Sequence, residues 1–170
     1  MPGIDPRQLA ALFERHAPAL VLYARQRLAA RDAEDAVQEV FVSLARQPRV
    51  PIESRAWLYK AVRQRVFGRR RARYRREKRH AASSERAPRW FETTPGQNID
   101  AEHAQSLLEQ LPLNQREAVV LRIWGHLTLE EIADVISCST SAAHRRYHTG
   151  IETLRKQMGV TCPGEDRSAS

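Results

Sequence analysis

Apolar residues recur at intervals of three and four over two stretches of the chain, residues 9–67 and 101–158. This spacing places them on one side of an α-helix, so each stretch predicts several amphipathic helices. The residues between them, 69–100, are polar and include two prolines and a glycine, which is typical of a linker. Because neither stretch shows signs of β-structure, the pattern predicts an all-α fold of two small helical domains joined by a flexible linker.

Helix-start signals divide the first stretch into four segments. Asp5 before Pro6 predicts a first helix, and Pro18 is expected to open a second. Asp32 is an N-cap candidate followed by an acidic first turn, and Ser54 can cap the fourth helix. The helix after Asp32 has its apolar residues on one face, namely Val37, Val40, Phe41 and Leu44.

The opposite face of the helix after Asp32 is acidic. It consists of Glu34, Asp35, Gln38 and Glu39. Carboxylates so close together can serve acid–base or metal chemistry, or they can form a docking surface for a basic protein partner. A metal site would usually need a further histidine or carboxylate from a second helix, and the neighbouring helices offer mainly arginine. The sequence therefore favours docking over catalysis.

The helix predicted after Ser54 combines an apolar stripe with basic residues. The polar residues away from the stripe can reach a polyanion. They are Lys60, Arg63, Gln64 and Arg69. Trp57 and Tyr59 offer flat faces on which an unpaired base could stack, as single-strand binders require. Burial in the core is the competing interpretation, and for Trp57 it is the favoured one.

Capping residues also divide the second stretch. Asp100 is expected to cap its first helix, and Asn114 to begin the next after a Leu–Pro stop. Residues 128–131 have the pattern of a capping box, and a short turn at 137–139 leads into a last helix at about residues 140–157. A short helix, a tight turn and a longer helix with polar or basic early residues form the helix-turn-helix design, which fits the DNA major groove.

Two histidines on the last helix raise the question of a metal site. His144 and His148 lie one turn apart, as two ligands of one metal ion can. No carboxylate-bearing catalytic motif accompanies them, and the two cysteines, 24 residues apart, lack the spacing of a zinc site. We therefore expect no metal, no cofactor and no catalytic residue, with these histidines facing solvent or DNA.

Positive charge is concentrated in one stretch. The 170 residues carry a net charge of +8, but residues 55–89 alone carry +12 and leave −4 for the rest. A local basic surface of this kind suits nucleic acid, although a solvated helix face or a disordered tail is the alternative. The longest apolar run is six residues, too short to cross a bilayer. We expect a cytoplasmic protein without membrane insertion.

Several motifs resemble those of extracytoplasmic-function (ECF) sigma factors, the small two-domain specificity subunits of bacterial RNA polymerase in group IV of the sigma-70 family. Residues 32–41, DAEDAVQEVF, are similar to the region 2 helix that docks on the β′ clamp coiled coil. Residues 56–65, AWLYKAVRQR, resemble the segment that opens and reads the minus-10 element. Residues 111–122 and 127–133 are similar to region 4, the reader of the minus-35 element.

The resemblance implies a division of the chain, binding residues and partners. Region 2 would span residues 1–76, a linker 77–100, region 4 residues 101–158 and a disordered tail 159–170. The implied polymerase contacts are Asp32, Asp35, Gln38, Glu39 and Phe41, the minus-10 contacts are Lys60, Arg63 and Gln64, and the minus-35 contacts are Arg122, His144, Arg145, His148 and Thr149. The implied partners are core RNA polymerase, through its β′ clamp helices and β flap, and promoter DNA, with an anti-sigma factor as an optional partner. The protein would join the nucleoid when bound to polymerase.

The sequence departs from the family pattern at three places. Gln64 stands where the family commonly has Asn at a position implicated in capturing an unstacked minus-10 base, so the amide is on a longer arm. His126 and the turn at residues 137–138 stand where the family has Gly. These turns are expected to differ slightly from the family pattern.

Two other functions remain as alternatives. One is an autonomous helix-turn-helix regulator, in which the second stretch binds palindromic DNA as a dimer and the first senses a signal. The other is an enzyme that acts on nucleic acid with Glu34, Asp35 and Glu39 as metal ligands. Binding to a palindromic site without polymerase, or cleavage that depends on a divalent metal, would distinguish them.

Overall fold

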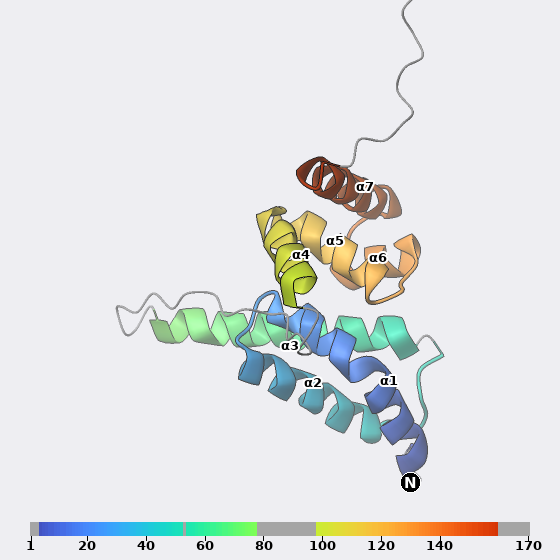
Figure 1. Ribbon diagram of the computed structural model, residues 1–170. Helices are drawn as coiled ribbons and strands as arrows, with labels where there is room; N and C mark the ends of the chain where they lie inside the picture. The colour runs from blue at the N-terminus through green and yellow to red at the C-terminus, as the bar shows by residue number, and fades with distance from the viewer. Residues whose placement is uncertain (1–3, 53, 78–97, 160–170) are drawn as a thin grey trace, which may run out of the picture.

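The computed structural model describes residues 4–52, 54–77 and 98–159, and over these ranges the chain is helical with no strand (Figure 1). The helices are α1 (Pro6–Arg25), α2 (Ala30–Ala45), α3 (Ser54–Glu77), α4 (Asn98–Gln110), α5 (Leu113–Ile123), α6 (Leu129–Ile136) and α7 (Thr140–Gln157). The all-α prediction is confirmed. Most of the predicted linker and nearly all of the predicted tail lie outside the described residues.

Helices α1 to α3, which we call the first unit, form a bundle in which each helix packs on the other two (Figure 1). Leu20, Leu44 and Leu58, one from each helix, are fully buried at its centre. Burying one leucine side chain stabilises a fold by about 2 kcal/mol. The shared core therefore keeps α2 and α3 side by side, which matters for the site described below.

A proline inside α1 contradicts the prediction that Pro18 opens a second helix. α1 is unbroken, and it begins after Asp5 as its N-cap, as predicted. A proline in a helix interior costs about 3 kcal/mol through a lost hydrogen bond and a clash with the preceding turn. Ala17 and Leu20 beside it are buried in the core, so tertiary packing outweighs that cost.

α2 and α3 also differ from the sequence expectations. The N-cap of α2 is Ala29, without a side-chain cap bond, and Asp32 lies within the first turn. A negative charge there still interacts favourably with the helix dipole. α3 continues to Glu77, so the arginine-rich residues after Gly68 are helical instead of beginning the linker. The high charge of these residues pointed to an exposed linker. An exposed residue can still be helical, and arginine has a high helix propensity.

Helices α4 to α7 form the second unit, which contains the predicted helix-turn-helix in α6 and α7. The capping box is confirmed: the Thr128 amide donates to the Glu131 carboxylate at 2.7 Å, and the Glu131 amide to the Thr128 hydroxyl at 3.2 Å. Ser139 caps α7. α7 lies so close to α5 that a Cβ at Gly150 would lie 2.8 Å from a methyl group of Val119.

Two predicted helix starts in the second unit are wrong by one to three residues. α4 begins at Asn98, so Asp100 lies inside it. α5 begins at Leu113, behind Pro112 and without a side-chain cap bond, so Asn114 lies one residue inside. The fixed φ of proline suits a helix start even without a capping side chain.

The two turns at which the sequence lacks the glycine of the family pattern have a left-handed backbone. His126 has a φ of 52° and Ser137 a φ of 55°. This conformation costs a residue with a Cβ roughly 1–2 kcal/mol. Ser137 is the C-cap of α6, and its amide donates to carbonyls of the last turn. Both turns therefore have the positive φ that glycine favours, although a residue with a side chain occupies each position.

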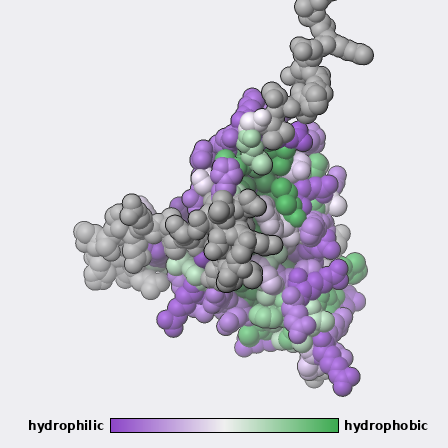
Figure 2. Space-filling view, viewed as in Figure 1, coloured by the Kyte–Doolittle hydropathy of each residue, from purple (hydrophilic) through white to green (hydrophobic). Residues whose placement is uncertain are grey.

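The two units lie directly against each other (Figure 1). α6 packs on α3, α5 contacts α1, and the buried apolar residues of both units form one connected core. On the face seen in Figure 2, hydrophilic residues cover most of the described surface. Within the described ranges, no helix is both long enough and apolar enough to span a membrane.

Candidate functional site

The acidic residues predicted on α2 form one exposed surface. This α2 acidic face consists of Asp32, Glu34, Asp35, Gln38 and Glu39, all of them exposed. Residues on the opposite side of the helix, such as Val37 and Val40, are buried in the core of the first unit. Phe41, predicted as a polymerase contact, is only 5% exposed. Its ring supports the surface from below and does not lie on it.

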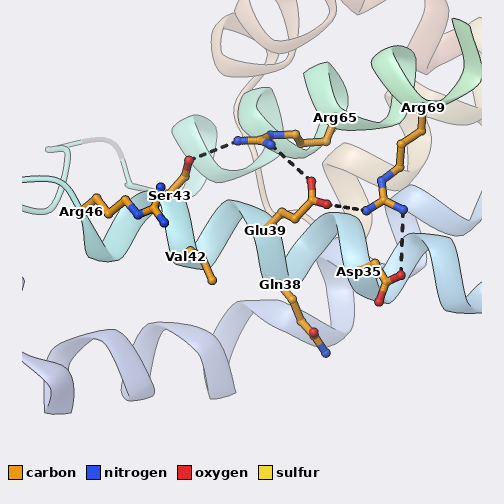
Figure 3. Close-up of a pocket in the computed structure, with 8 residues that line it drawn as sticks. All are labelled: Asp35, Gln38, Glu39, Val42, Ser43, Arg46, Arg65 and Arg69. Atoms are coloured by element: carbon orange, nitrogen blue, oxygen red, sulfur yellow. Dashed lines mark hydrogen bonds and ion pairs between the residues drawn. The ribbon is translucent and has the colours of Figure 1, made fainter. Parts of the chain in front are cut away.

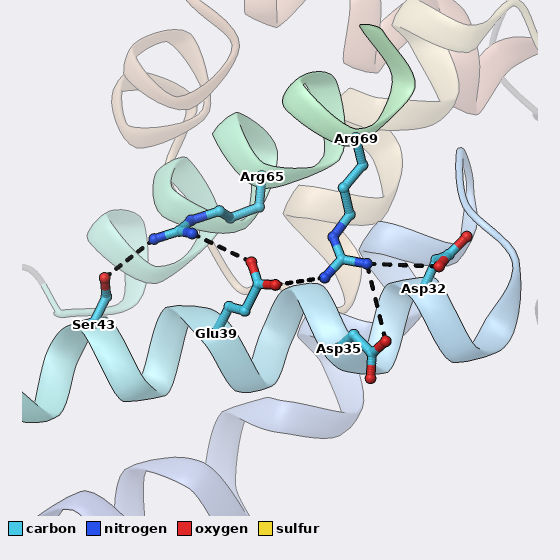
Figure 4. A network of polar contacts seen from close by, with 6 residues as sticks. All are labelled: Asp32, Asp35, Glu39, Ser43, Arg65 and Arg69. Carbon is cyan, nitrogen blue, oxygen red and sulfur yellow. Dashed lines mark hydrogen bonds and ion pairs between the residues drawn. The ribbon is translucent and has the colours of Figure 1, made fainter. Parts of the chain in front are cut away.

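Arg69 from α3 bridges three carboxylates of the α2 acidic face (Figure 4). Its Nη2 donates to Glu39 Oε1 at 2.7 Å, and its Nη1 lies 3.6 Å from Asp32 Oδ1 and 4.0 Å from Asp35 Oδ2. The three carboxylate side chains are about half exposed. Ion pairs this open to water contribute about 0–1 kcal/mol each, so Arg69 can leave them at little cost.

Arg65, one turn before Arg69, completes the network. Its guanidinium donates to Glu39 Oε2 and to Ser43 Oγ, both at 3.2 Å. Figure 3 shows Arg65 and Arg69 reaching from α3 to α2. Four carboxylates and two arginines leave the surface with a net charge of −2. A basic partner would therefore be attracted, but it would have to compete with these two arginines.

An apolar groove adjoins the α2 acidic face between α1 and α2. It is lined by Leu9, Phe13, Gln38, Phe41, Val42, Ala45 and Arg46. Phe13 is exposed at one side and packs edge-on against Phe41, with ring centres 4.9 Å apart. Gln38 and Val42 point away from α3 in Figure 3. A groove with an acidic rim suits a helix that presents both apolar and basic residues.

The second unit occupies two of the three predicted minus-10 contacts. Lys60 Nζ donates to Oδ1 of Asp134 on α6 at 2.8 Å. Arg63 Nε donates to Oε1 of Glu117 on α5 at 3.1 Å. Gln64 is exposed. Lys60 and Arg63 are thus paired with carboxylates of the second unit in this structure, although the Lys60 side chain is still 44% exposed. That the three side chains bind the minus-10 element stays a prediction.

Glu117 is the buried charge at the contact between the units. Its side chain is 5% exposed and accepts hydrogen bonds from the Tyr23 hydroxyl at 2.5 Å, Arg63 at 3.1 Å and Arg27 at 3.1 Å. Both guanidinium groups also lie over the ring of Phe67, at 4.6 Å for Arg63 and 4.8 Å for Arg27. Three donors from the first unit thus surround one carboxylate of the second.

The Glu117 cluster holds Tyr23 in its neutral form. Burial raises the pKa of Tyr23 well above 10.0, and the Glu117 carboxylate raises it further by its charge and by accepting the hydroxyl proton in a hydrogen bond. A carboxylate buried without partners would cost several kcal/mol. The phenol and the two arginines compensate for that cost only while the units are in contact.

The two aromatic residues of α3 predicted to stack on DNA bases pack on the hydrophobic core instead. Tyr59 is 2% exposed and packs edge-on against Tyr23, with ring centres 5.4 Å apart. Burial also raises the pKa of Tyr59. Trp57 is half-buried and packs on the core, as favoured from the sequence. The stacking interpretation is therefore wrong for Tyr59 in this conformation.

The residues predicted to read the minus-35 element form an exposed strip on the second unit. Those on α7 are His144, Arg145, His148 and Thr149. The rings of His144 and His148 lie with their centres 4.0 Å apart and their planes tilted by 37°. Arg122 is exposed too, but its Nη1 donates to the Leu127 carbonyl at 2.6 Å and so braces the turn before α6. Among the described residues, no group of three or more histidines, cysteines and carboxylates is placed to hold a metal ion.

Comparison with known proteins places both units in one family. The profile described as Sigma-70 region 2 matches residues 12–77, and that described as Sigma-70, region 4 matches residues 102–154. The ECF RNA polymerase sigma factor ShbA of Streptomyces griseus subsp. griseus is 31% identical over 154 residues, which cover 81% of each chain. The chain belongs to the ECF RNA polymerase sigma factors. This sigma factor accordingly directs promoter recognition and transcription initiation, as its sequence motifs predicted.

Solved structures share the fold of this sigma factor across both units. The sigma factor RpoE from Bartonella quintana, solved in complex with the anti-sigma factor NepR, matches with a TM-score of 0.72 and 20% identity over 92% of this chain and 97% of that one. CnrH, solved in complex with the cytosolic domain of CnrY, matches with a TM-score of 0.60 and 24% identity over 93% and 92% of the two chains.

Sequence reasoning missed Glu117 and the arginine partners of the α2 acidic face. Glu117 lies next to the buried Ala118 and four residues before the buried Leu121, and a carboxylate among apolar neighbours is a signal that could have identified it. No comparable signal pairs Arg65 or Arg69 with α2. That contact depends on how two helices lie side by side, which helical spacing does not specify.

Proposed function

We propose that the first unit of this sigma factor docks on core RNA polymerase through the α2 acidic face and the adjoining apolar groove. Asp32, Asp35, Gln38 and Glu39 would contact basic residues of the β′ clamp helices, and Phe41 would support the groove from below. The observation that carries this proposal is an exposed acidic helix face beside an apolar groove, within the segment that matches region 2. Charge attraction would guide the encounter, and burial of the groove would add affinity.

Promoter recognition is divided between the two units in this proposal. Lys60, Arg63 and Gln64 on α3 would hold the melted minus-10 strand, while the α7 strip and Arg122 would read the minus-35 duplex, with the β flap as a further contact of region 4. Joining two weak sites on one chain raises their effective concentration on the promoter. Each flipped base costs a few kcal/mol to unstack, and its capture offsets part of that cost. The mechanism is binding and strand capture, without covalent chemistry or a cofactor.

The proposal divides the chain into region 2 at residues 1–76, a linker at 77–100, region 4 at 101–158 and a tail at 159–170. The sigma factor would act in the cytoplasm and join the nucleoid when bound to polymerase. The fold it shares with a sigma factor solved together with an anti-sigma factor supports an anti-sigma protein as a further partner.

Reversing the charge of Asp35 and Glu39 to lysine tests the docking surface. We expect the double variant to lose most of its binding to core polymerase in a pull-down, and most of its transcript from a template with mapped start sites. Reversing Glu14 and Glu152, two exposed carboxylates outside this surface, changes the net charge equally and should leave both readouts intact. Full polymerase binding by the Asp35 and Glu39 variant would overturn the docking assignment.

Arg145→Ala tests the minus-35 strip. If Arg145 forks onto one base, the variant should lose roughly 1–3 kcal/mol of selectivity at a single upstream base pair. Arg155→Ala on the last turn of α7 is the matched control, with selectivity unchanged. An equal loss of binding on every promoter sequence would show that Arg145 contacts only phosphate.

A further inference from the structure

Three carboxylates of the α2 acidic face are already paired with arginines of the same chain. Asp32, Asp35 and Glu39 lie on the side of α2 that faces α3, where Arg65 and Arg69 reach them (Figure 4). A guanidinium group binds a carboxylate in the same way whether it belongs to the same chain or to another protein. The two arginines therefore occupy the positions that basic residues of a docking partner would take.

Glu39 is the carboxylate that these arginines occupy most completely. Its Oε1 accepts a hydrogen bond from Arg69 Nη2 at 2.7 Å, and its Oε2 accepts one from Arg65 Nη1 at 3.2 Å. An arginine of a partner would bind a carboxylate best through two parallel hydrogen bonds, one to each oxygen. It cannot form both on Glu39 until Arg65 and Arg69 have left. Docking at Glu39 is therefore an exchange of ion pairs, which weakens the net affinity.

The apolar core, and not this network, holds α2 and α3 together. Val62 and Val66 of α3 are buried in the same core as Val40 of α2. The side chains of Arg65 and Arg69 are 43% and 28% exposed, and ion pairs this open to water add little to stability. Replacing either arginine should therefore leave the fold intact and change only the surface.

The arginines also act through the charge of the whole surface. The α2 acidic face with both arginines carries a net charge of −2, and the loss of one arginine would make it −3. A basic partner associates faster and more tightly with a surface of greater opposite charge. Arg65 and Arg69 therefore reduce the attraction that the four carboxylates would exert alone.

We propose that Arg65 and Arg69 are intramolecular competitors that set the affinity of this sigma factor for core RNA polymerase. They occupy the carboxylates in the free chain, and basic residues of polymerase displace them on docking. The inference rests on the docking through the α2 acidic face proposed above. At a given concentration, the sigma factor then occupies less of the core polymerase than its carboxylates alone would allow.

Arg69→Gln in the full chain tests the competition without DNA. The glutamine keeps a hydrogen-bond donor but removes the competing charge. We expect the Kd for core polymerase, measured by fluorescence anisotropy, to fall about two- to five-fold, and further when Arg65→Gln is added. The Kd should also depend more steeply on salt, because the surface carries more charge to be screened. Arg69→Lys retains the charge and should keep the Kd near the wild-type value.

Arg70→Gln is the matched control, because it removes the same charge from the next position of α3. Arg70 is exposed, and it lies about 100° around the helix from Arg69. Its replacement should change the Kd and the salt dependence less than Arg69→Gln does. Circular dichroism verifies that each variant is folded. If Arg69→Gln does not fold, Arg65→Gln alone decides by the same two readouts.

The competition is refuted if folded Arg69→Gln binds core polymerase no more tightly than Arg70→Gln. Weaker binding by Arg69→Gln would refute it too, because the arginines would then position the carboxylates for the partner. The charge reversal of Asp35 and Glu39 distinguishes this failure from a failure of the docking proposal. If the reversal abolishes binding while Arg69→Gln has no effect, docking is retained and only the competition is wrong. If the reversal leaves binding intact, both proposals are wrong.

Discussion

Two arginine–carboxylate networks meet on α3, and they differ chiefly in their exposure to water. In one, Arg63 and Arg27 hold Glu117, whose side chain is 5% exposed. In the other, Arg65 and Arg69 hold Glu39, whose side chain is 47% exposed. Their distances are similar, near 3 Å, so contact geometry does not separate them.

The difference shows that the solvent around an ion pair determines its role. Water screens the exposed network, so its arginines can exchange for a basic partner at little cost. The buried network lacks that screening, and removing one member leaves an uncompensated charge. The exposed network therefore suits a surface open to a partner, and the buried one suits a contact between two parts of the chain.

The largest expected effect separates the two networks directly. Glu117→Ala should lower the free energy of unfolding by about 3 kcal/mol, the lower end for a broken buried ion pair, because Arg27 and Arg63 can turn toward solvent. Glu39→Ala should lower it by about 1 kcal/mol at most. Urea unfolding followed by circular dichroism measures both, with Glu14→Ala as an exposed control on α1. Equal losses would refute the comparison.

High pH should weaken the buried network but not the exposed one. The pKa of Tyr23 is raised above 10.0 in the folded chain, so its stabilising contribution is complete below pH 10 and is lost as the pH rises toward the raised pKa. The stability should fall by up to about 1.4 kcal/mol per pH unit from this group. Urea unfolding between pH 9 and 11 measures the slope. Tyr23→Phe should reduce the slope of stability against pH, and Glu39→Gln should leave it unchanged. An unchanged slope in Tyr23→Phe would show that the loss of stability at high pH does not come from Tyr23.

A stabilising substitution far from both networks tests whether the effect of the buried network is local. Ser137→Gly should raise the free energy of unfolding by about 1 kcal/mol, because glycine adopts the φ of 55° without strain. The gain should add to the loss in Glu117→Ala, since the two sites share no partner. Ser141→Gly inside α7 is the opposite control and should destabilise. A clear deviation from additivity in urea unfolding would mean that the α6–α7 turn is coupled to the contact around Glu117.

The smallest expected effect concerns the exposed network. A double-mutant cycle of Arg69→Ala and Glu39→Ala should give a coupling energy of about 0.5 kcal/mol. Salt should reduce it further, because screening acts on exposed charges. Urea unfolding at low and high ionic strength measures both values. A coupling of several kcal/mol that is insensitive to salt would place Glu39 in the same class as Glu117.

Much of the fold was predictable because its signals are local. The capping box at Thr128, the cap at Asp5 and the acidic face of α2 each depend on residues within one or two helical turns. Pro18 and Asp32 were misassigned because local rules place both at helix starts, whereas burial of neighbouring residues extends the helices past them. Tyr59 was open to two interpretations because an aromatic residue serves a core or a base equally well.

The sequence alone determined the helices, their exposed and buried faces, the concentration of basic charge and the motifs of the family. These properties follow from spacing along the chain, which the helical period converts into faces. Only the tertiary structure decided that Arg69 binds the α2 acidic face, that Glu117 is enclosed by three donors of the first unit, and that Lys60 meets Asp134. Such contacts join residues from 30 to 94 positions apart. They depend on which helices pack together and exclude water from between them. The spacing of residues along one helix does not specify that packing.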